Sequence, residues 1–196
     1  MQIFVDKNKL LTSGDIPINY HNLYDGTADF SGENWTNLDA YTNDNWVSNF
    51  GNQSRQRKGS WFGLSKPMHL NANQFYTLSA SVFVDENSSS GFISFFGNDD
   101  QGNNSLPSGI AKLYFKDAPH SWVTVKQTFS VPKSGTYNVR FESNDDQVNI
   151  HWADLMLNKG SIALDWNYSL NDLRAKMGGV KPNYWFCYAT SVKEVA

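Results

Sequence analysis

The sequence has a single cysteine, Cys187, among its 196 residues. One thiol excludes an intrachain disulfide, so no covalent cross-link within the chain stabilises the fold. Cys187 lies in the apolar run 184–188 and has no activating base close to it in the sequence. This setting favours a buried small side chain over a catalytic thiol.

Charged residues are also few, at 18% of the chain, and 16 Lys and Arg against 19 Asp and Glu give a net charge of -3. The one dense basic cluster is Arg55, Arg57 and Lys58, in a Gly-, Asn-, Gln- and Ser-rich stretch typical of a solvated loop. Proteins that bind nucleic acid usually carry a basic patch. We therefore expect no nucleic-acid partner and a neutral or weakly charged ligand.

Long apolar runs are missing. No stretch approaches the length of a membrane span, and the N-terminal segment 1–7 lacks the apolar core of an export signal. We expect no membrane partner and no signal peptide. A protein of this kind that acts outside the cell would be made in the cytoplasm and leave by another route, such as lysis.

Sequence signatures of catalysis are missing as well. The four histidines do not have zinc-site spacing, and neither a nucleophile elbow nor a phosphate-binding glycine loop is present. The adjacent pairs Asp99-Asp100 and Asp145-Asp146 lie in turn-rich stretches, where Asp favours the turn itself. Glycoside hydrolysis needs two carboxylates held across the scissile bond. The sequence therefore predicts a protein that is not an enzyme.

Aromatic residues, by contrast, are abundant, at 15% of the chain. From residue 59 onward, short apolar runs, many with a period of two, alternate with turn-rich stretches; the first run is 61–64, and 75–84 shows the alternation clearly. This pattern is typical of half-buried antiparallel strands, and it predicts an all-β, two-sheet β-sandwich. The positions expected to be buried are Leu78, Ala80, Val82, Leu113, Val123, Val125, Val139 and Phe141.

The pattern divides the chain into three parts. Residues 1–20 form an N-terminal leader, 21–175 the β-sandwich, and 176–196 a C-terminal extension that supplies an extra strand or an oligomer contact. The only helix expected lies near 169–177, where Ser169 is placed to cap it and Gly178-Gly179 to end it.

Several segments resemble jelly-roll carbohydrate-binding modules in their order and spacing: 77–80, 122–125 leading into 129–132, and 135–137. The stretch 157–166 is similar to the end of such modules in tail and baseplate proteins of phages that infect Gram-positive bacteria, and 22–27 fits the family's first strand. The resemblance covers residues 20 to 175. The segment after Gly178 has no counterpart, and the turn 158–160 lacks one acidic residue of the family pattern.

A sugar ring offers an apolar C–H face and an edge of hydroxyls, so its site combines an aromatic platform with polar side chains. The candidates for carbohydrate binding are Trp46, Trp61, Tyr114, Arg140 and Glu142. Tyr114, Arg140 and Glu142 fall on the outward side of alternating strands, where an ordinary solvated sheet face is the alternative. Trp46 and Trp61 stand in a polar loop region, and core packing is the alternative for both.

Some modules of this family carry a structural calcium near the first and last strands. Asp154 matches the position of an acidic ligand in the last strand, with Asp29 as a second acidic residue in the first part of the domain. Calcium needs several oxygen ligands, and the sequence shows only scattered ones. No other cofactor is expected.

The resemblance implies a non-catalytic phage tail or baseplate module for host adhesion, a component of the virion that recognises cell-wall polysaccharide. Such a module would be a homo-oligomer or part of a multimeric particle, because several copies raise weak single-site affinity. Two alternatives stay open. One is a structural tail adaptor that binds other phage proteins, and the other is a domain appended to a glycosidase.

Overall fold

The computed structural model describes residues 21–85, 90–104, 106 and 108–176, and the backbone of two short strands closer to the N-terminus, β1 (Ile3–Phe4) and β2 (Leu10–Leu11). These two strands pair with each other in antiparallel register. Cys187 and the rest of the C-terminal extension after residue 176, which is expected to supply an extra strand or an oligomer contact, lie outside the described residues. No helix in the described part of the chain is long and apolar enough to cross a membrane.

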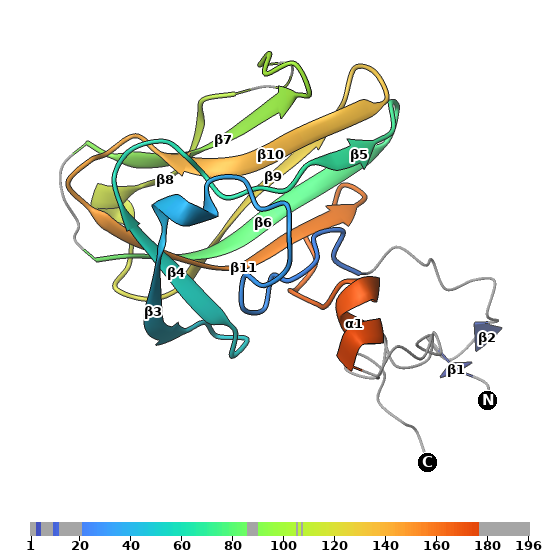
Figure 1. Ribbon diagram of the computed structural model, residues 1–196, viewed down its shortest axis with the longest axis horizontal. Helices are drawn as coiled ribbons and strands as arrows, with labels where there is room; N and C mark the ends of the chain where they lie inside the picture. Colours follow the sequence, from blue (N-terminus) through green and yellow to red (C-terminus); the bar gives the residue numbers. More distant parts are fainter. Residues whose placement is uncertain are drawn as a thin grey trace.

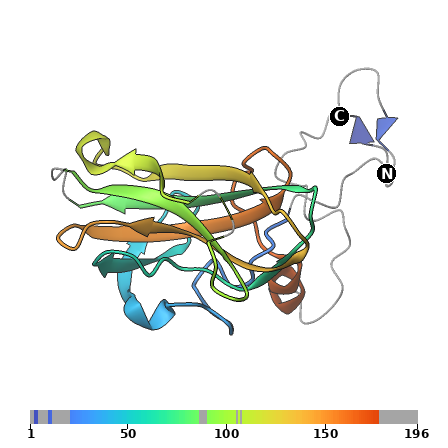
Figure 2. The ribbon, with the colours of Figure 1, turned by 90° about the horizontal axis from the view of Figure 1, so that it is seen from above.

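The protein is an all-β jelly-roll sandwich of two antiparallel sheets, which lie one over the other (Figures 1 and 2). The four-stranded sheet has the order β5 (Met68–Leu70), β10 (Gly135–Ser143), β7 (Phe92–Asp99), β8 (Ile110–Tyr114). The five-stranded sheet has the order β3 (Thr42–Val47), β4 (Gln53–Lys58), β11 (Asn149–Lys159), β6 (Phe75–Val84), β9 (Val123–Ser130). Short 3-10 turns occupy Leu38–Ala40 and Phe115–Asp117.

The core lies between the two sheets and follows the alternation in the sequence. Strand β6 spans the 75–84 range predicted for it, and its residues Leu78, Ala80 and Val82 are buried. Of the eight positions expected to be buried, six are. Leu113 and Val123 are only half-buried, because β8 and β9 are edge strands that have a neighbour on one side alone.

Two local predictions had different outcomes. The apolar run 61–64 is not a strand. It lies in the loop between β4 and β5, so its aromatic residues belong to neither sheet. The helix α1 (Leu170–Lys176) forms where expected, and the Ser169 hydroxyl accepts a 3.0 Å hydrogen bond from the backbone N–H of Asp172, as an N-cap does.

Because side chains alternate along a strand, each sheet has an outer face as well as a core face. On β10, Tyr137, Val139 and Phe141 fill the core, so Asn138, Arg140 and Glu142 point outward. On β6 the outward row includes Phe75 and Phe83. These two outer faces lie on opposite sides of the sandwich.

Candidate glycan-binding cleft

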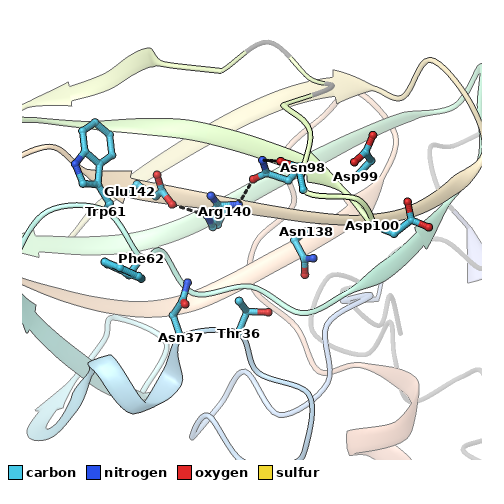
Figure 3. A pocket seen from close by; sticks show the side chains of 11 residues that line it. Thr36, Asn37, Trp61, Phe62, Asn98, Asp99, Asp100, Asn138, Arg140 and Glu142 are labelled. Carbon is cyan, nitrogen blue, oxygen red and sulfur yellow. Dashed lines mark hydrogen bonds and ion pairs between the residues drawn. The ribbon is translucent and has the colours of Figure 1, made fainter.

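A cleft of about 490 Å³ lies on the outer face of the four-stranded sheet (Figure 3). Strand β10 supplies its floor, the turn that follows β7 stands at one end, and two loops from the chain before β5 close the side. The lining residues are Thr36, Asn37, Trp61, Phe62, Asn98, Asp99, Asp100, Gly102, Asn138, Arg140 and Glu142.

Arg140 is the central polar group of the floor, and the protein holds it on two sides. Its Nε donates to Glu142 Oε1 at 2.5 Å, and Nη1 donates to Asn98 Oδ1 at 2.5 Å. The Asn98 amide nitrogen donates to Gly102 O and Asn104 Oδ1, which fixes its oxygen toward Arg140. In the described part of the chain Nη2 has no acceptor, so this end of the guanidinium is available to a ligand.

Glu142 has a structural role as well as a place in the cleft. Its side chain is 5% exposed, and Oε1 also accepts a 3.4 Å hydrogen bond from the backbone N–H of Gly63. A buried carboxylate needs such partners, since burial of an unpaired charge is costly. Glu142 therefore connects the floor of the cleft to the loop that carries Trp61.

Aromatic rings form the wall beside Arg140. Trp61 is 46% exposed, and its ring lies edge-on to Phe96 of β7, with 5.8 Å between the centroids. Register places Phe96 directly opposite Arg140, and the guanidinium carbon is 6.0 Å from the Phe96 centroid. Phe62, also exposed, follows Trp61 in the same loop and points along the side of the cleft (Figure 3). Apolar rings and a fixed cation are thus adjacent.

Backbone conformation gives the loop its unusual shape. Trp61 and Phe62 have φ values of 58° and 57°, a left-handed region that costs non-glycine residues about 1–2 kcal/mol each. Gly63 follows, and a Cβ there would lie 2.1 Å from the carbonyl oxygen of Phe141. The chain therefore passes closely over β10 and turns two aromatic residues outward. Such strain is concentrated at ligand sites in other proteins.

Hydrogen bonds from three directions hold this loop. The backbone N–H of Trp61 donates to Ser143 O at 2.7 Å, and that of Ser60 donates to Asp146 Oδ1 at 2.7 Å. Arg57 donates to Ser60 O and lies 5.3 Å from the Phe62 ring centroid. The loop is therefore ordered before any ligand arrives, which lowers the entropic cost of binding.

The cleft carries a net negative charge. Asp99, Asp100 and Glu142 contribute three carboxylates, and Arg140 is the one cation among the lining residues. Burial alone would raise the pKa of Asp99, but hydrogen bonds from Asn103 and Gln101 hold that pKa below its ordinary value. Asp99 is therefore ionised at neutral pH, and the cleft disfavours an anionic ligand.

The structure brings three of the five predicted residues together, Trp61, Arg140 and Glu142. Tyr114 is on the same sheet but outside the cleft, on edge strand β8, where its ring contacts Phe92 at 5.8 Å. Trp46 is on strand β3 of the other sheet, so it cannot contact a ligand held between Trp61 and Arg140.

Sequence reasoning missed Phe62 and Asn98, which line the cleft, and Phe96, which contacts Trp61 beside it. The position of Asn138 follows from the alternation of β10, which puts it on the same outward row as Arg140. To place Phe96 and Asn98 near Arg140, one must know the register of β7 against β10. That register pairs Phe96 with Arg140 and Asn98 with Asn138. A one-residue slip in register would have turned both away, and the sequence does not contain that information.

Asp154 is buried, but its surroundings supply little else for calcium. Its Oδ1 accepts hydrogen bonds from Ser48 Oγ at 2.7 Å and Asn52 Nδ2 at 2.6 Å, while Oδ2 is buried without a partner in the described chain. Asp29 is exposed, and its carboxylate accepts a bond from Ser31 N. Among the described residues no group of three or more His, Cys, Asp or Glu side chains is placed to hold a metal. Ca²⁺ takes several oxygen ligands, and the described side chains around Asp154 do not supply them. The calcium site is a prediction that the structure does not test.

Comparisons with known proteins establish the fold. No family model matches the sequence, and no curated protein matches it. Among solved structures, the C-terminal family 22 carbohydrate-binding module of Clostridium thermocellum Xyn10B is similar over 74% of this chain and 98% of its own, at 16% identity and a TM-score of 0.54. The module thus has nearly the same extent as the β-sandwich described here.

Two larger proteins contain a similar domain. An arabinose-bound α-L-arabinofuranosidase matches over 72% of this chain and 27% of its own, at 16% identity and a TM-score of 0.52. The enzymatically active domain of bacteriophage CBA120 tailspike protein 4 matches over 72% of this chain and 22% of its own, at 15% identity and a TM-score of 0.51. This chain therefore spans about a quarter of each, and at such identities the likeness shows the fold alone.

Proposed function

We propose that the chain is a non-catalytic carbohydrate-binding module whose ligand lies in the cleft on the four-stranded sheet. The observation that carries this proposal is the placement of an exposed indole, Trp61, beside a guanidinium, Arg140, that the protein itself fixes on two sides. The C–H face of a pyranose packs against the aromatic wall. Its hydroxyls accept from Arg140 Nη2 and donate to neighbouring oxygens.

Asn138 strengthens this assignment. Its amide oxygen is buried without a hydrogen-bond partner in the described chain, and the residue lines the cleft between Arg140 and Asp99. A buried acceptor without a partner costs about 1–3 kcal/mol. Because this oxygen is closed off from the cleft, we expect the Asn138 side chain to turn on binding, so that a sugar hydroxyl can then satisfy it.

Two of the three carboxylates of the cleft, Glu142 and Asp99, are occupied in ways that favour binding over hydrolysis. Glu142 pairs with Arg140 and Gly63, and Asp99 accepts from the backbone N–H groups of Gln101 and Asn103. A general acid in a glycosidase needs a raised pKa and a free proton. The pKa of Asp99 is instead lowered, which suits a structural acceptor.

The biological setting proposed is host adhesion by a phage tail or baseplate, where the module would act in the virion at the surface of a Gram-positive cell. Support comes from the sequence resemblance over residues 20–175 and from the occurrence of this fold in a phage tailspike. Several copies on one particle would raise the weak affinity of a single cleft. A tail adaptor would instead bind a phage protein and no glycan.

Isothermal titration with xylohexaose, cellohexaose and purified Gram-positive cell-wall polysaccharide tests the proposal. We expect Trp61→Ala to weaken binding at least about tenfold, because a central aromatic anchor is lost. The melting temperature should stay nearly unchanged, since Trp61 is half exposed. Tyr114→Ala, an exposed aromatic on the same sheet outside the cleft, is the matched control and should bind as the parent does.

Two results would contradict the proposal. The first is a parent protein that binds none of these glycans but captures a purified tail protein, which would favour the adaptor. The second is release of reducing ends from the polysaccharide, which would show an enzyme.

A further inference from the structure

A second group of aromatic side chains lies on the outer face of the five-stranded sheet, on the opposite side of the sandwich from the cleft. Trp46 of β3 is 42% exposed and stacks on His151 of β11, with 4.2 Å between the centroids and 8° between the planes. Phe83 of β6 lies edge-on to Trp46 at 4.8 Å, and Trp122 lies edge-on to Phe83 at 6.1 Å. The indole therefore has one face covered by the imidazole and the other open.

The imidazole beneath Trp46 is fixed from both ends. His151 is buried, its Nδ1 lies 2.6 Å from Asp44 Oδ2, and its Nε2 lies 2.8 Å from Asp85 Oδ1. Each ring nitrogen thus lies within hydrogen-bonding distance of a carboxylate, which fixes the orientation of the ring. Asn149 completes the cluster with bonds from its amide nitrogen to Asp85 Oδ2 and Gln56 Oε1, both at 2.9 Å.

The backbone beneath Trp46 is held as well. Its N–H donates to Asp44 Oδ1 at 3.0 Å, and Ser54 Oγ donates to its carbonyl oxygen at 3.0 Å. The pairing of β3 with β4 is interrupted between Asn43 and Val47, so this stretch bulges out of the ladder and places the indole over its neighbour. A hydrophobic side chain ordered only by burial would not need this support. An exposed ring held flat suits the role of a preformed platform.

We infer that Trp46 is a second glycan-binding platform, independent of the cleft and on the opposite face of the module. The inference takes its ligand class, a neutral pyranose chain, from the proposed function. The open indole face receives the C–H face of a sugar, and the partly exposed Asp85 lies near enough to the stack to accept from a hydroxyl. A purely apolar protein partner fits less well, because a hydrogen-bonded group of polar side chains, Asp44, Asp85, Asn149 and Gln56, lies beside the stacked rings.

The test uses the full chain and reads each platform separately. In ¹⁵N-labelled protein the indole Nε1–H signals of Trp46 and Trp61 are assigned from Trp46→Phe and Trp61→Phe, and both are followed during titration with xylohexaose, cellohexaose and laminarihexaose to millimolar concentration. We expect saturable shifts at both indoles. Trp46→Ala deletes its own reporter signal, so binding at that face is then followed at the indole of neighbouring Trp122, whose response should be lost while that of Trp61 stays intact.

Matched variants separate a ligand site from ordinary packing. Phe75→Ala removes an exposed aromatic from the same outer face, at the other end of β6, and should leave both responses unchanged. Trp46→Ala should weaken binding at its face about tenfold or more, the loss expected when one stacked ring is removed. Trp46→Phe, which keeps a ring over His151, should retain part of that binding.

The outcomes distinguish the two proposals. Shifts at Trp61 alone, or an unchanged Trp46 signal with every glycan, would overturn the second platform and leave the proposed function standing. Shifts at Trp46 alone would support the platform and overturn the cleft. No response at either indole would overturn both.

Discussion

Arg140 makes both of its hydrogen bonds within the protein to side chains of the outer sheet face. Its effects on glycan affinity and on the free energy of unfolding can therefore be measured separately. We predict that Arg140→Lys weakens glycan binding about tenfold or more, because an ammonium cannot reach Glu142, Asn98 and a sugar together. The unfolding free energy should fall by about 1–3 kcal/mol, since buried Glu142 loses its partner.

Removing both partners tests the cause of that loss. The double variant Arg140→Met, Glu142→Gln leaves no unpaired buried charge, so chemical denaturation should show much of the stability restored. Binding measured by titration should stay weak. A double variant that binds like the parent would show that Arg140 does not contact the ligand.

Asp154 supports a second residue-scale prediction, this time for stability. The carboxylate is buried at a φ of 53° and accepts from Ser48 and Asn52. We predict that Asp154→Ala lowers the unfolding free energy by about 2–4 kcal/mol, through two lost hydrogen bonds and strain at a left-handed position. Asp154→Asn tolerates this φ better and should cost less.

Thermal unfolding of the same proteins in EDTA and in added Ca²⁺ tests the calcium that the sequence suggested. A calcium-dependent rise in the melting temperature of the parent that is absent in Asp154→Ala would assign the ion to this carboxylate.

At the scale of elements, the strands were predictable and the connections between them were not. The alternation of β6, β9 and β10 placed their core faces correctly, because a half-buried strand shows its period of two directly in the sequence. The run 61–64 shows the limit of that argument. It is as apolar as a strand, yet its left-handed residues and the approach of Gly63 to Phe141 are consequences of packing against β10.

The residues of the candidate site were likewise predictable in part, whereas the way they come together was not. Arg140 and Glu142 were found because they alternate with core residues on one strand, and Trp61 because it is aromatic in polar surroundings. Their convergence depends on the path of the 59–63 loop and on the β7–β10 register, which are tertiary properties. Trp46 carried the same sequence signal as Trp61, and Tyr114 the same signal as Arg140. Only the sheet order shows that Trp46 belongs to the other sheet and that Tyr114 lies on edge strand β8, outside the cleft.

The 59–63 loop, which carries Trp61, also supports a prediction about pH. Hydrogen bonds from the hydroxyl and the backbone N–H of Ser60 hold the pKa of Asp146 below its ordinary value of 3.8. A carboxyl with a lowered folded-state pKa stabilises the fold above its unfolded pKa, and that contribution is lost as the pH falls through the folded value. We therefore expect the loop to loosen only below pH 3.8.

Asp146→Asn provides the comparison. The parent should retain its glycan affinity from neutral pH down to about pH 5, where this carboxyl is still ionised. The variant should bind more weakly across that range, because its amide holds Ser60 less strongly. Equal affinities of the two proteins at neutral pH would show that the Ser60 contact does not position Trp61.

On the scale of the whole molecule, charge limits which glycans the proposed site would accept. The chain has a net charge of -3, and the cleft places Asp99, Asp100 and Glu142 around a single cation that Glu142 already neutralises. Arg140 therefore acts as a donor of hydrogen bonds rather than as a free positive charge. The carboxylates of the cleft would repel an anionic wall polymer, whereas a neutral glycan chain would meet no electrostatic repulsion there.

We predict that neutral cell-wall polysaccharide binds with an affinity that changes less than about twofold between low and high salt, since no ion pair forms with the ligand. Anionic teichoic acid should bind more weakly, and its binding should improve as salt screens the repulsion. Titrations of both polymers across a salt series measure this. The double variant Asp99→Asn, Asp100→Asn should narrow the difference between the polymers, because it removes two of the three carboxylates of the cleft. Tight, salt-sensitive binding of teichoic acid by the parent would instead mean that Arg140 pairs with the ligand's charge, and that the wall polymer recognised is an anionic one.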